Sequence, residues 1–475
     1  MSLGRVLDAL RGALAPQDAL LLVMAVILLR HEADMERGHE ADMERGDEWG
    51  GLTPAREAWG ALMSGGLWQD GGHGLAEALR RGLRAREAEF PSRLDLPNLD
   101  GVRGHQVAPL IDWVAAAPDL TQIFEACLDH TQSTSKGGDY YTPSDVARLL
   151  AGVMEPREGD AVYDPVCGSG GLLLRAREYL EVNGGHADEL ALYGQDASRI
   201  ALQTAAMNVS VHGAAARLKG PESTLVSDRF ADLTFDVVVA NPPFNQSGWD
   251  EGGYLRHSLP WPYGVPPAGN ANFAWAQHVV RKMTPTGRGA LLLPTGAATT
   301  TKAGEGRIRA GLVADDVLSC VVELPAGLIP HVRNPVSLWL LTKSKKPRDN
   351  WGRSDRSGQF LLIDARDTAA SVTRGRRAVP EEARQRIIKT FAAWRGVPGS
   401  EPYEDVPAWC TSVSRDEIAA KEYDVLPSHH VAAPPAESVP ADGHERAADL
   451  TDELLGLFET SRRLEAELRD LLGQL

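Results

Sequence analysis

The chain has 475 residues, of which 43% are hydrophobic and 24% charged, and this composition is typical of a soluble globular protein with two or three domains. Its formal net charge of -16 argues against a protein that binds nucleic acid unaided, because phosphate contacts need clustered Lys and Arg. The four cysteines lie far apart and form no CxxC pair. Neither a disulfide framework nor a metal site is therefore indicated, and we expect a cytoplasmic protein.

The N-terminal part has a helical pattern without a convincing strand. Val6, Leu10 and Leu14 fall on one face of a predicted helix, and the apolar run 19–29 follows. That run is too short to span a bilayer, so we interpret it as a core helix and expect no membrane contact. We predict an all-helical domain over residues 1–130.

An eight-residue segment, HEADMERG, occurs twice in tandem, at residues 31–38 and 39–46. Its His and Glu residues do not have the HExxH spacing of a zinc site. A lengthened surface helix or loop is the simpler interpretation.

From about Asp139 the pattern changes to alternating strands and helices, which is typical of a doubly wound, mainly parallel α/β sheet. We assign this α/β domain to residues 131–400. Continuous apolar runs predict the strands, and helical periodicity predicts the segments between them. The predicted strands are 161–163, 190–194, 235–240, 289–293, 317–324, 337–342 and 360–364, and the predicted helices are 171–180, 198–208 and 273–283.

The last part of the chain, residues 401–475, is predicted to be a linker and a docking helix. The sequence becomes Pro-rich after Pro398, with a linker near residues 431–440. Leucines then recur at alternating spacings of four and three residues, which is a heptad seam with one polar interruption. We expect this helix to pack against a helix of a partner or, alternatively, against the N-terminal domain of its own chain. The seam residues are Leu450, Leu454, Leu457, Ser461, Leu464, Leu468, Leu471 and Leu475.

Residues 236–244, DVVVANPPF, combine a buried strand with four chemically specific residues. The run VVVA is apolar without polar alternation, as in a central parallel strand that is covered on both faces. The two prolines cannot continue a ladder, so the strand must stop at Asn241. An amide, two prolines and the ring of Phe244 thus follow the carboxyl end of a central strand, where open α/β sheets bind their ligands.

A glycine-rich turn, residues 164–171 (DPVCGSGG), follows the first predicted strand and precedes a helix. Glycines therefore lie where the backbone must approach a ligand closely. Leu173 stands where the dinucleotide fingerprint GxGxxG needs its third Gly. Asp164 suits a ligand with a cationic amine better than NAD, and Cys167 is interpreted as a small turn residue because no base accompanies it.

Asp196 ends the second predicted strand, from which a carboxylate can accept both hydroxyls of a ribose. Its alternative role is that of a helix N-cap. Together the residues at the two strand ends indicate a site that binds a nucleoside and has no phosphate-binding residues. S-adenosylmethionine fits this description, because it carries adenosine, a ribose and an amino-acid tail with a cationic amine.

The NPPF residues could then act on the exocyclic amine of adenine, a poor nucleophile because its lone pair is delocalised into the ring. Hydrogen bonds from this amine to the Asn241 side-chain oxygen and the Pro242 carbonyl would favour a pyramidal nitrogen, and Phe244 would stack on the base. Catalysis would come from positioning and oriented dipoles. Flipping the adenine out of a duplex costs a few kcal/mol, which is comparable to the about 1–3 kcal/mol gained by stacking.

These residues resemble the N6-adenine amino-methyltransferases, and more closely the modification (M) subunits of type I restriction-modification systems. Residues 137–143 (GGDYYTP) resemble the Y(F/Y)TP segment of that family, and residues 164–171 its DPxCGSGG turn. Residues 241–244 match its NPPF motif, and residues 270–275 (NANFAW) resemble its NADFAW helix start. The resemblance covers most of the chain.

The resemblance implies a seven-stranded methyltransferase sheet, S-adenosylmethionine as cofactor, no metal, and site-specific methylation of the N6 amine of a flipped adenine in DNA. It also implies a complex of two such chains with one specificity (S) subunit that reads the DNA sequence and that the heptad helix would bind. A restriction (R) subunit would cleave DNA, since this sequence has no GxxxxGK(S/T) P-loop. The implied cofactor residues are Tyr140, Tyr141, Thr142, Pro143, Asp164, Gly168, Ser169, Gly170, Gly171 and Asp196, and the implied catalytic residues are Asn241, Pro242, Pro243 and Phe244.

Two positions depart from the family pattern. Asp196 stands where the family usually has Glu, which shortens the ribose-binding carboxylate by one methylene. Residues 222–225 read ESTL where the family often has GDTL, so Ser223 replaces an acid expected near the adenine of the cofactor.

Two other functions are compatible with these motifs. Protein glutamine N5-methyltransferases use the same Asn-Pro-Pro-aromatic chemistry, but they are shorter, usually have Tyr after the prolines, and lack the N-terminal helical domain and the heptad tail. A catalytically impaired assembly scaffold is the other alternative. The intact residues 241–244 argue against it, while Ser223 leaves room for it.

Overall fold

The computed structural model describes residues 1–43, 54–65, 71–84, 94–134, 142–329, 332, 334–348, 351–373, 376–433 and 455. Several predicted features lie outside this described part. They are the linker from residue 434 onward, the heptad seam of residues 450–475 including Ser461, the end of the second HEADMERG copy, and the expected cofactor residues Tyr140 and Tyr141.

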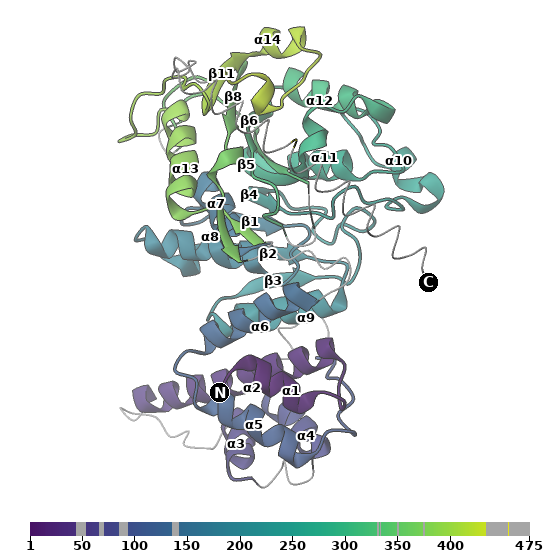
Figure 1. Cartoon of the computed structure of the whole chain (residues 1–475), viewed down its shortest axis with the longest axis vertical. Helices are drawn as coiled ribbons and strands as arrows, with labels where there is room; N and C mark the ends of the chain where they lie inside the picture. The colour runs from purple at the N-terminus through teal and green to yellow at the C-terminus, as the bar shows by residue number, and fades with distance from the viewer. Residues whose placement is uncertain are drawn as a thin grey trace.

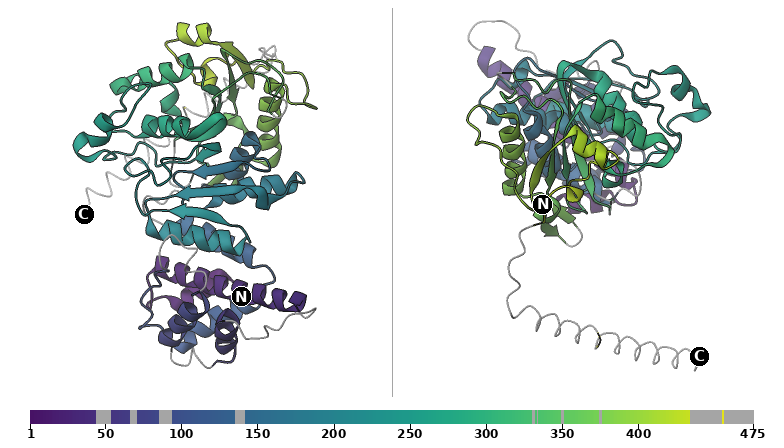
Figure 2. Two further views of the ribbon diagram at one scale, coloured as in Figure 1. Left: turned by 180° about the vertical axis from the view of Figure 1, so that it is seen from behind. Right: turned by 90° about the horizontal axis from the view of Figure 1, so that it is seen from above.

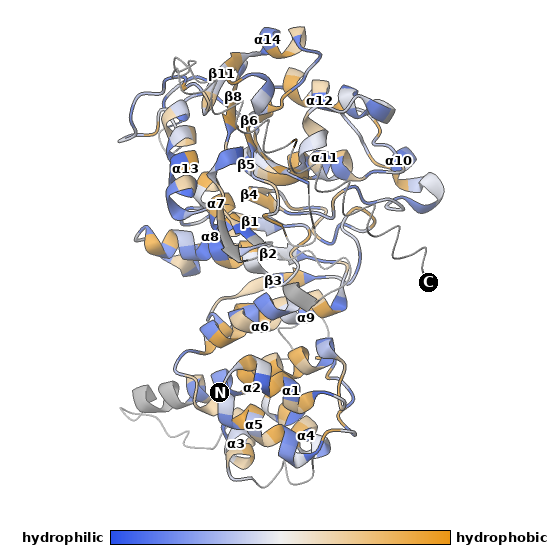
Figure 3. Cartoon of the chain, viewed as in Figure 1, coloured by the Kyte–Doolittle hydropathy of each residue, from blue (hydrophilic) through white to orange (hydrophobic). Residues whose placement is uncertain are grey.

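The N-terminal part is helical, as predicted, and its centre is α2 (Pro16–Met43). All residues of the apolar run 19–29 are buried in α2, which confirms that it is a core helix. Figure 3 shows hydrophobic, orange stretches on α2 and on the helices beside it. The first HEADMERG copy continues this helix, and α2 ends at Met43 within the second copy. Among the described residues, no helix combines the length and apolarity that a membrane span requires. The other helices of this part are α1 (Leu3–Leu10), α3 (Pro54–Met63), α4 (Gly72–Gly82), α5 (Gly104–Ala115) and α6 (Leu120–Thr134).

Nine strands of the described chain form one mixed sheet, in the order β11-β8-β6-β7-β5-β4-β1-β2-β3 (Figure 1). Strands β3, β2, β1, β4 and β5 are parallel to one another, whereas β7 is antiparallel to both β5 and β6. Seven of these strands, β1, β2, β4, β5, β6, β7 and β8, match the predicted strands, and β3 and β11 add one strand at each edge of the sheet. The strands are β1 (Ala161–Asp164), β2 (Ala191–Gln195), β3 (Ala216–Lys219), β4 (Phe235–Ala240), β5 (Met283–Pro294), β6 (Leu318–Glu323), β7 (Val336–Thr342), β8 (Gln359–Asp364) and β11 (Cys410–Ser414), and β9 (Ala370–Thr373) with β10 (Arg376–Ala378) forms a separate hairpin.

Helices cover both faces of the sheet and create two apolar layers (Figures 1 and 2). On one face lie α7 (Ser144–Met154), α8 (Gly171–Val182) and α13 (Glu381–Arg395), and on the other lie α11 (Asn272–Lys282), α12 (Glu305–Ala314) and α14 (Arg415–Ala420). A sheet covered in this way explains why its central strands read as continuous apolar runs. The short helix α10 (Tyr254–Ser258) lies in the connection between β4 and α11.

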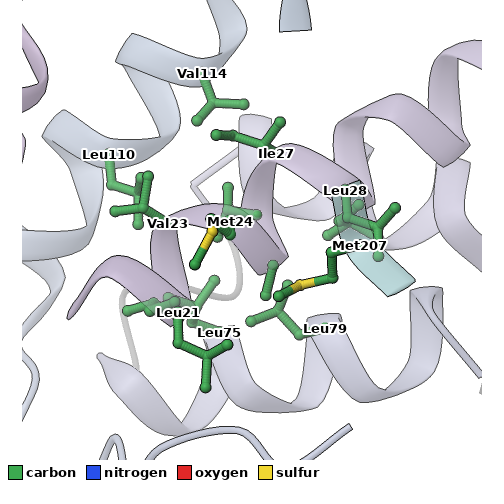
Figure 4. Close-up of a cluster of buried hydrophobic side chains, with 14 of the residues drawn as sticks. Leu21, Val23, Met24, Ile27, Leu28, Leu75, Leu79, Leu110, Val114 and Met207 are labelled. Carbon is green, nitrogen blue, oxygen red and sulfur yellow. The ribbon is translucent and has the colours of Figure 1, made fainter. Parts of the chain in front are cut away.

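The N-terminal helices pack against α9 (Arg199–Val211), beside the β3 edge of the sheet. Met207 of α9 is fully buried in the same cluster as Leu28 and Leu79, and Figure 4 shows its side chain pointing between them. The expected domain boundary at residue 130 lies inside α6. We therefore propose that the boundary lies between α6 and α7.

The irregular segment expected after Pro398 contains more structure than its sequence suggests. Strand β11 pairs antiparallel with β8, and α14 follows it directly with a capping box at Ser414 and Glu417. Strand β3, at the opposite edge, was also not predicted. Both strands are short and half-exposed, so they lack the apolar run that identifies a central strand.

Candidate active site

The site lies where the strand order reverses, because β1 pairs with β2 on one side and with β4 on the other. In open α/β sheets the crevice at such a point, outside the carboxyl ends of the strands, binds the ligand. The structure has a cavity of about 280 Å³ there. Of the residues that the sequence placed in the site, Gly168, Ser169, Asp196, Asn241 and Pro243 line this cavity.

The glycine turn, residues 164–171, connects β1 to α8 and depends on two left-handed glycines. Gly168 has a φ of 52° and Gly170 a φ of 79°, a conformation that side chains with a Cβ rarely adopt. The backbone N–H of Cys167 donates to the carbonyl of Gln195 at 2.9 Å, which ties the turn to the end of β2. Burial raises the pKa of the Cys167 thiol well above its usual value, consistent with a small packing residue rather than a nucleophile.

Asp196 joins the turn to the second strand end through both of its carboxylate oxygens. Oδ2 accepts from the backbone N–H of Gly168 at 2.9 Å, and Oδ1 accepts from the backbone N–H of Ser198 at 2.8 Å. The N-cap of α9 is Ser198, whose hydroxyl accepts from Ala201. The N-cap alternative for Asp196 is therefore wrong. A carboxylate has about four acceptor sites, so Asp196 can still accept ribose hydroxyls.

Asp164 is buried at the end of β1, where its Oδ1 accepts from the backbone N–H of Val166 at 3.0 Å. Burial, with a smaller contribution from the nearby charge of Asp196, raises the pKa of this carboxyl to about 8. A cation placed beside it would favour the ionised form. The environment therefore fits the expected ligand with a cationic amine.

The loop after β3 forms one wall of the cavity, which it lines with Ser223 and Thr224. Gln195 holds this loop: its Nε2 donates to the carbonyl of Ser227 at 2.7 Å, and its Oε1 accepts from the backbone N–H of Arg229 at 3.0 Å. The Thr224 hydroxyl donates to the carbonyl of Pro165 at 2.5 Å. The roles of Gln195 and Thr224 were not predicted, although Gln195 stands next to Asp196 in the strand-end motif.

Asn241 is 3% exposed, and of the two polar atoms of its side-chain amide only the nitrogen has a hydrogen-bond partner among the described residues. Its Nδ2 donates to the hydroxyl of Thr142 at 3.0 Å, across 99 residues of chain. Its Oδ1 is buried and has no hydrogen-bond partner in the described part of the chain. Thr142, which the resemblance places at the cofactor, also orients the Asn241 amide. The free carbonyl oxygen belongs to a cavity-lining residue and can accept a hydrogen bond from a ligand.

The remaining expected residues of the described structure do not line the cavity. Phe244 is half-buried and packs on the apolar layer that includes α7, α8 and α13. Pro143 is the N-cap residue of α7, and Gly171 begins α8. Pro242 is buried in the NPPF turn, residues 241–244.

One wall of the cavity comes from the N-terminal helices, and no motif in their sequence predicts this position. Gln17, Leu20, Leu21 and Met24 of α2 line it. Among the lining residues that the structure describes, Asp196 is the one charged side chain. An apolar cavity with a single carboxylate favours a cationic, partly apolar ligand and disfavours a phosphate.

Comparisons with known proteins agree with this geometry. The sequence profile described as "N-6 DNA Methylase" matches residues 116–438. The chain is 32% identical over 341 residues to the methylase subunit of the type I restriction enzyme HindI from Haemophilus influenzae, which covers 72% of this chain and 74% of that protein.

Solved structures share the fold. The methyltransferase subunit of a type I restriction-modification system from Streptococcus thermophilus superimposes with a TM-score of 0.69 at 20% identity, over 90% of this chain and 98% of that one. A chain from a type I restriction-modification structure concerned with complex assembly and conformational transition gives a TM-score of 0.63 at 19% identity, over 98% and 97% of the two chains. The profile match spans most of the sequence, and the chain therefore belongs to the N-6 DNA methylase family.

Proposed function

We propose that this chain transfers a methyl group from S-adenosylmethionine to the N6 amine of adenine in DNA, as the modification subunit of a type I restriction-modification complex. The observation that carries this proposal is the Asn241 amide. It is buried at the end of β4, its Nδ2 is fixed by Thr142, and its Oδ1 has no partner among the described residues. Such an oxygen is suited to accept a hydrogen bond from an amine.

The cavity fits S-adenosylmethionine, which supplies the methyl group on a sulfonium centre. The glycine turn lets the ligand approach the backbone, and Asp196 offers acceptors to the ribose hydroxyls. Asp164 provides a buried carboxyl for the cationic amine. The lining has no Lys or Arg among the described residues, so a cationic ligand meets no repulsion there.

The NPPF turn acts on the acceptor. Asn241 Oδ1 accepts one N6–H of the adenine, and the Pro242 carbonyl accepts the other, which opposes delocalisation of the nitrogen lone pair into the ring. These dipoles are held before the reaction begins, so they need little reorganisation in the transition state. For an adenine in duplex DNA, Phe244 would turn from its packed position to stack on the flipped base, contributing about 1–3 kcal/mol.

Partners are also part of this proposal. A chain with a net charge of -16 has little electrostatic attraction to DNA, so recognition of the target sequence is assigned to a specificity subunit. Two copies of this chain would bind one such subunit through the heptad segment of residues 450–475, and a restriction subunit would cleave the DNA.

The test is methyl transfer from labelled S-adenosylmethionine to DNA, with the chain alone and with the co-expressed specificity subunit. We expect label on N6 of adenine in the second mixture and little in the first. Cofactor binding without adenine labelling in either mixture would instead support an assembly scaffold. Label on a glutamine of a protein would indicate a glutamine methyltransferase.

A further inference from the structure

Two polar atoms on residues that line the cavity, besides Asn241 Oδ1, have no partner. Gln246 lies two residues beyond the NPPF turn, and its Oε1 is a buried acceptor without a donor. Trp275 of α11 is 2% exposed, and its Nε1–H is a buried donor without an acceptor. Both statements refer to the described residues. Buried polar groups are nearly always paired, so an unpaired acceptor and an unpaired donor at one cavity indicate a ligand that satisfies both.

A set of hydrogen bonds joins the two backbone segments that carry these side chains. The backbone N–H of Asn245 donates to Asn272 Oδ1, and Asn272 Nδ2 donates to Asn245 Oδ1, both at 2.9 Å. The backbone N–H of Ala271 donates to the carbonyl of Gln246 at 3.0 Å. The segment after the NPPF turn is thus joined to the first turn of α11, which carries Trp275. The segments that carry the acceptor and the donor are therefore held together.

An acceptor and a donor on the lining of one cavity can together complement one edge of adenine, which presents an amine donor next to a ring-nitrogen acceptor at N1 or N7. We propose that Gln246 Oε1 and the Trp275 Nε1–H read this edge of an adenine ring. This inference rests on the proposed function, in which both the cofactor and the acceptor base carry adenine.

The position of Trp275 favours the adenine of the cofactor. Its ring belongs to a buried cluster with Leu225 and Trp249, and Val166 of the glycine turn packs against that cluster. Trp275 thus lies on the side of the cavity formed by the glycine turn and the Ser223 loop. In the family pattern an acid at position 223 contacts the adenine of the cofactor, and Ser223 replaces it here. On this proposal Gln246 and Trp275 supply the adenine contact instead.

The first arm of the test measures binding to the full-length chain by calorimetry. The probes are S-adenosylhomocysteine and its 1-deaza and 7-deaza analogues, which each lack one ring acceptor. We expect one analogue to bind the wild-type chain about tenfold more weakly than the parent, which corresponds to one neutral hydrogen bond. In Trp275→Phe this difference should vanish, because the donor is gone while the aromatic ring remains. The analogue of S-adenosylhomocysteine whose purine lacks the amine tests Gln246 in the same way. The wild-type chain should bind it more weakly than the parent ligand, and in Gln246→Leu this difference should vanish.

Trp249→Phe is the matched control. Trp249 lies in the same cluster and is 3% exposed, but its Nε1–H already donates to the carbonyl of Pro267 at 3.0 Å. Its substitution perturbs the cluster without removing a free donor. The preference for the parent ligand over the deaza analogue should therefore stay as in the wild type, even if both ligands bind more weakly.

The second arm measures methyl transfer by the complex to DNA with 1-deaza- or 7-deazaadenine at the target position. Loss of discrimination in Trp275→Phe in the binding arm assigns the pair to the cofactor. Loss of discrimination only in the transfer arm assigns it to the acceptor base. Unchanged discrimination in both arms overturns the inference while the proposed function stands. A wild-type chain that neither binds S-adenosylhomocysteine nor methylates adenine would overturn both.

Discussion

The turns that follow β1 and β4 border the same cavity but are built in opposite ways. In the glycine turn the polar groups pair within the protein, because Asp196 accepts from Gly168 and Asp164 accepts from Val166. In the NPPF turn, Asn241 Oδ1 has no partner among the described residues. The first turn therefore presents backbone and charge, and the second presents an open dipole. We infer that the first turn positions a ligand and the second acts on the reacting group.

Asn241→Ala gives the largest expected effect and tests this difference directly. Removal of a preorganised dipole at the reacting atom should lower the rate constant of methyl transfer about a thousandfold. Cofactor affinity should change little, because the glycine turn keeps its own contacts. Single-turnover transfer and equilibrium binding of S-adenosylhomocysteine measure the two quantities separately. Asn183→Ala, at a surface asparagine of the α8 end, is the control. Equal loss of rate and affinity would mean that both turns bind the cofactor.

Asp164→Asn tests the charge that the glycine turn presents. The raised pKa of about 8 means that Asp164 is mostly protonated at neutral pH without ligand, whereas a bound cation requires the carboxylate. Binding then releases a proton, so cofactor affinity should rise with pH up to about 8, by at most about tenfold per pH unit.

In Asp164→Asn the rise of cofactor affinity with pH that comes from Asp164 should disappear. Its size is the difference between the affinity–pH curves of the wild type and the variant. The linked effect on the unliganded chain has the opposite sign: wild-type stability should fall between pH 4 and 8, as the unfolded carboxyl ionises and the buried one does not. Asp188→Asn, at an exposed carboxylate, serves as control. A variant that keeps the wild-type slope would assign the titration to another group.

The sequence predicted the two strand ends well because both carry local signals. The central strands are apolar runs between turns, and Asn241 and Asp196 directly follow two of them. Edge strands β3 and β11 escaped prediction, because a short, half-exposed strand lacks a run that separates it from a loop.

Contacts between distant segments could not be predicted from a local pattern. Thr142 and Asn241 are 99 residues apart, and Leu21 of α2 reaches the cavity only because the N-terminal helices pack on α9. The amphipathic pattern of a helix shows that it is buried, but not which element covers it. The wall formed by α2 and the hydroxyl of Thr142 that orients Asn241 were therefore not predicted from any motif.

Thr142→Val sharpens the comparison by changing how the open dipole is held. Valine has a similar shape but cannot accept from Asn241 Nδ2, so the amide loses its fixed orientation. We expect the transfer rate constant to fall about tenfold, the value of one neutral hydrogen bond, with recovery in Thr142→Ser. Thr131→Val is a matched control, since Thr131 also lines the cavity but its hydroxyl donates to the carbonyl of Cys127 in its own helix. A fall in cofactor affinity at an unchanged rate constant would return Thr142 to the cofactor site.

Gly170→Ala and Gly171→Ala give the smallest effects and test whether the glycine turn is defined by its backbone. A Cβ at Gly170 would meet Ala205 at an ordinary 3.5 Å, so the cost is the positive φ of 79° and not a clash. That conformation costs a residue with a side chain about 1 kcal/mol, which corresponds to a melting temperature lower by roughly 2 °C. Gly171 has no positive φ and nothing within 4 Å of its Cβ position, so Gly171→Ala should be neutral or stabilise α8 by up to about 1 kcal/mol. Thermal unfolding of the unliganded variants measures both shifts. Equal destabilisation by the two substitutions would show that packing, rather than backbone conformation, selects glycine in this turn.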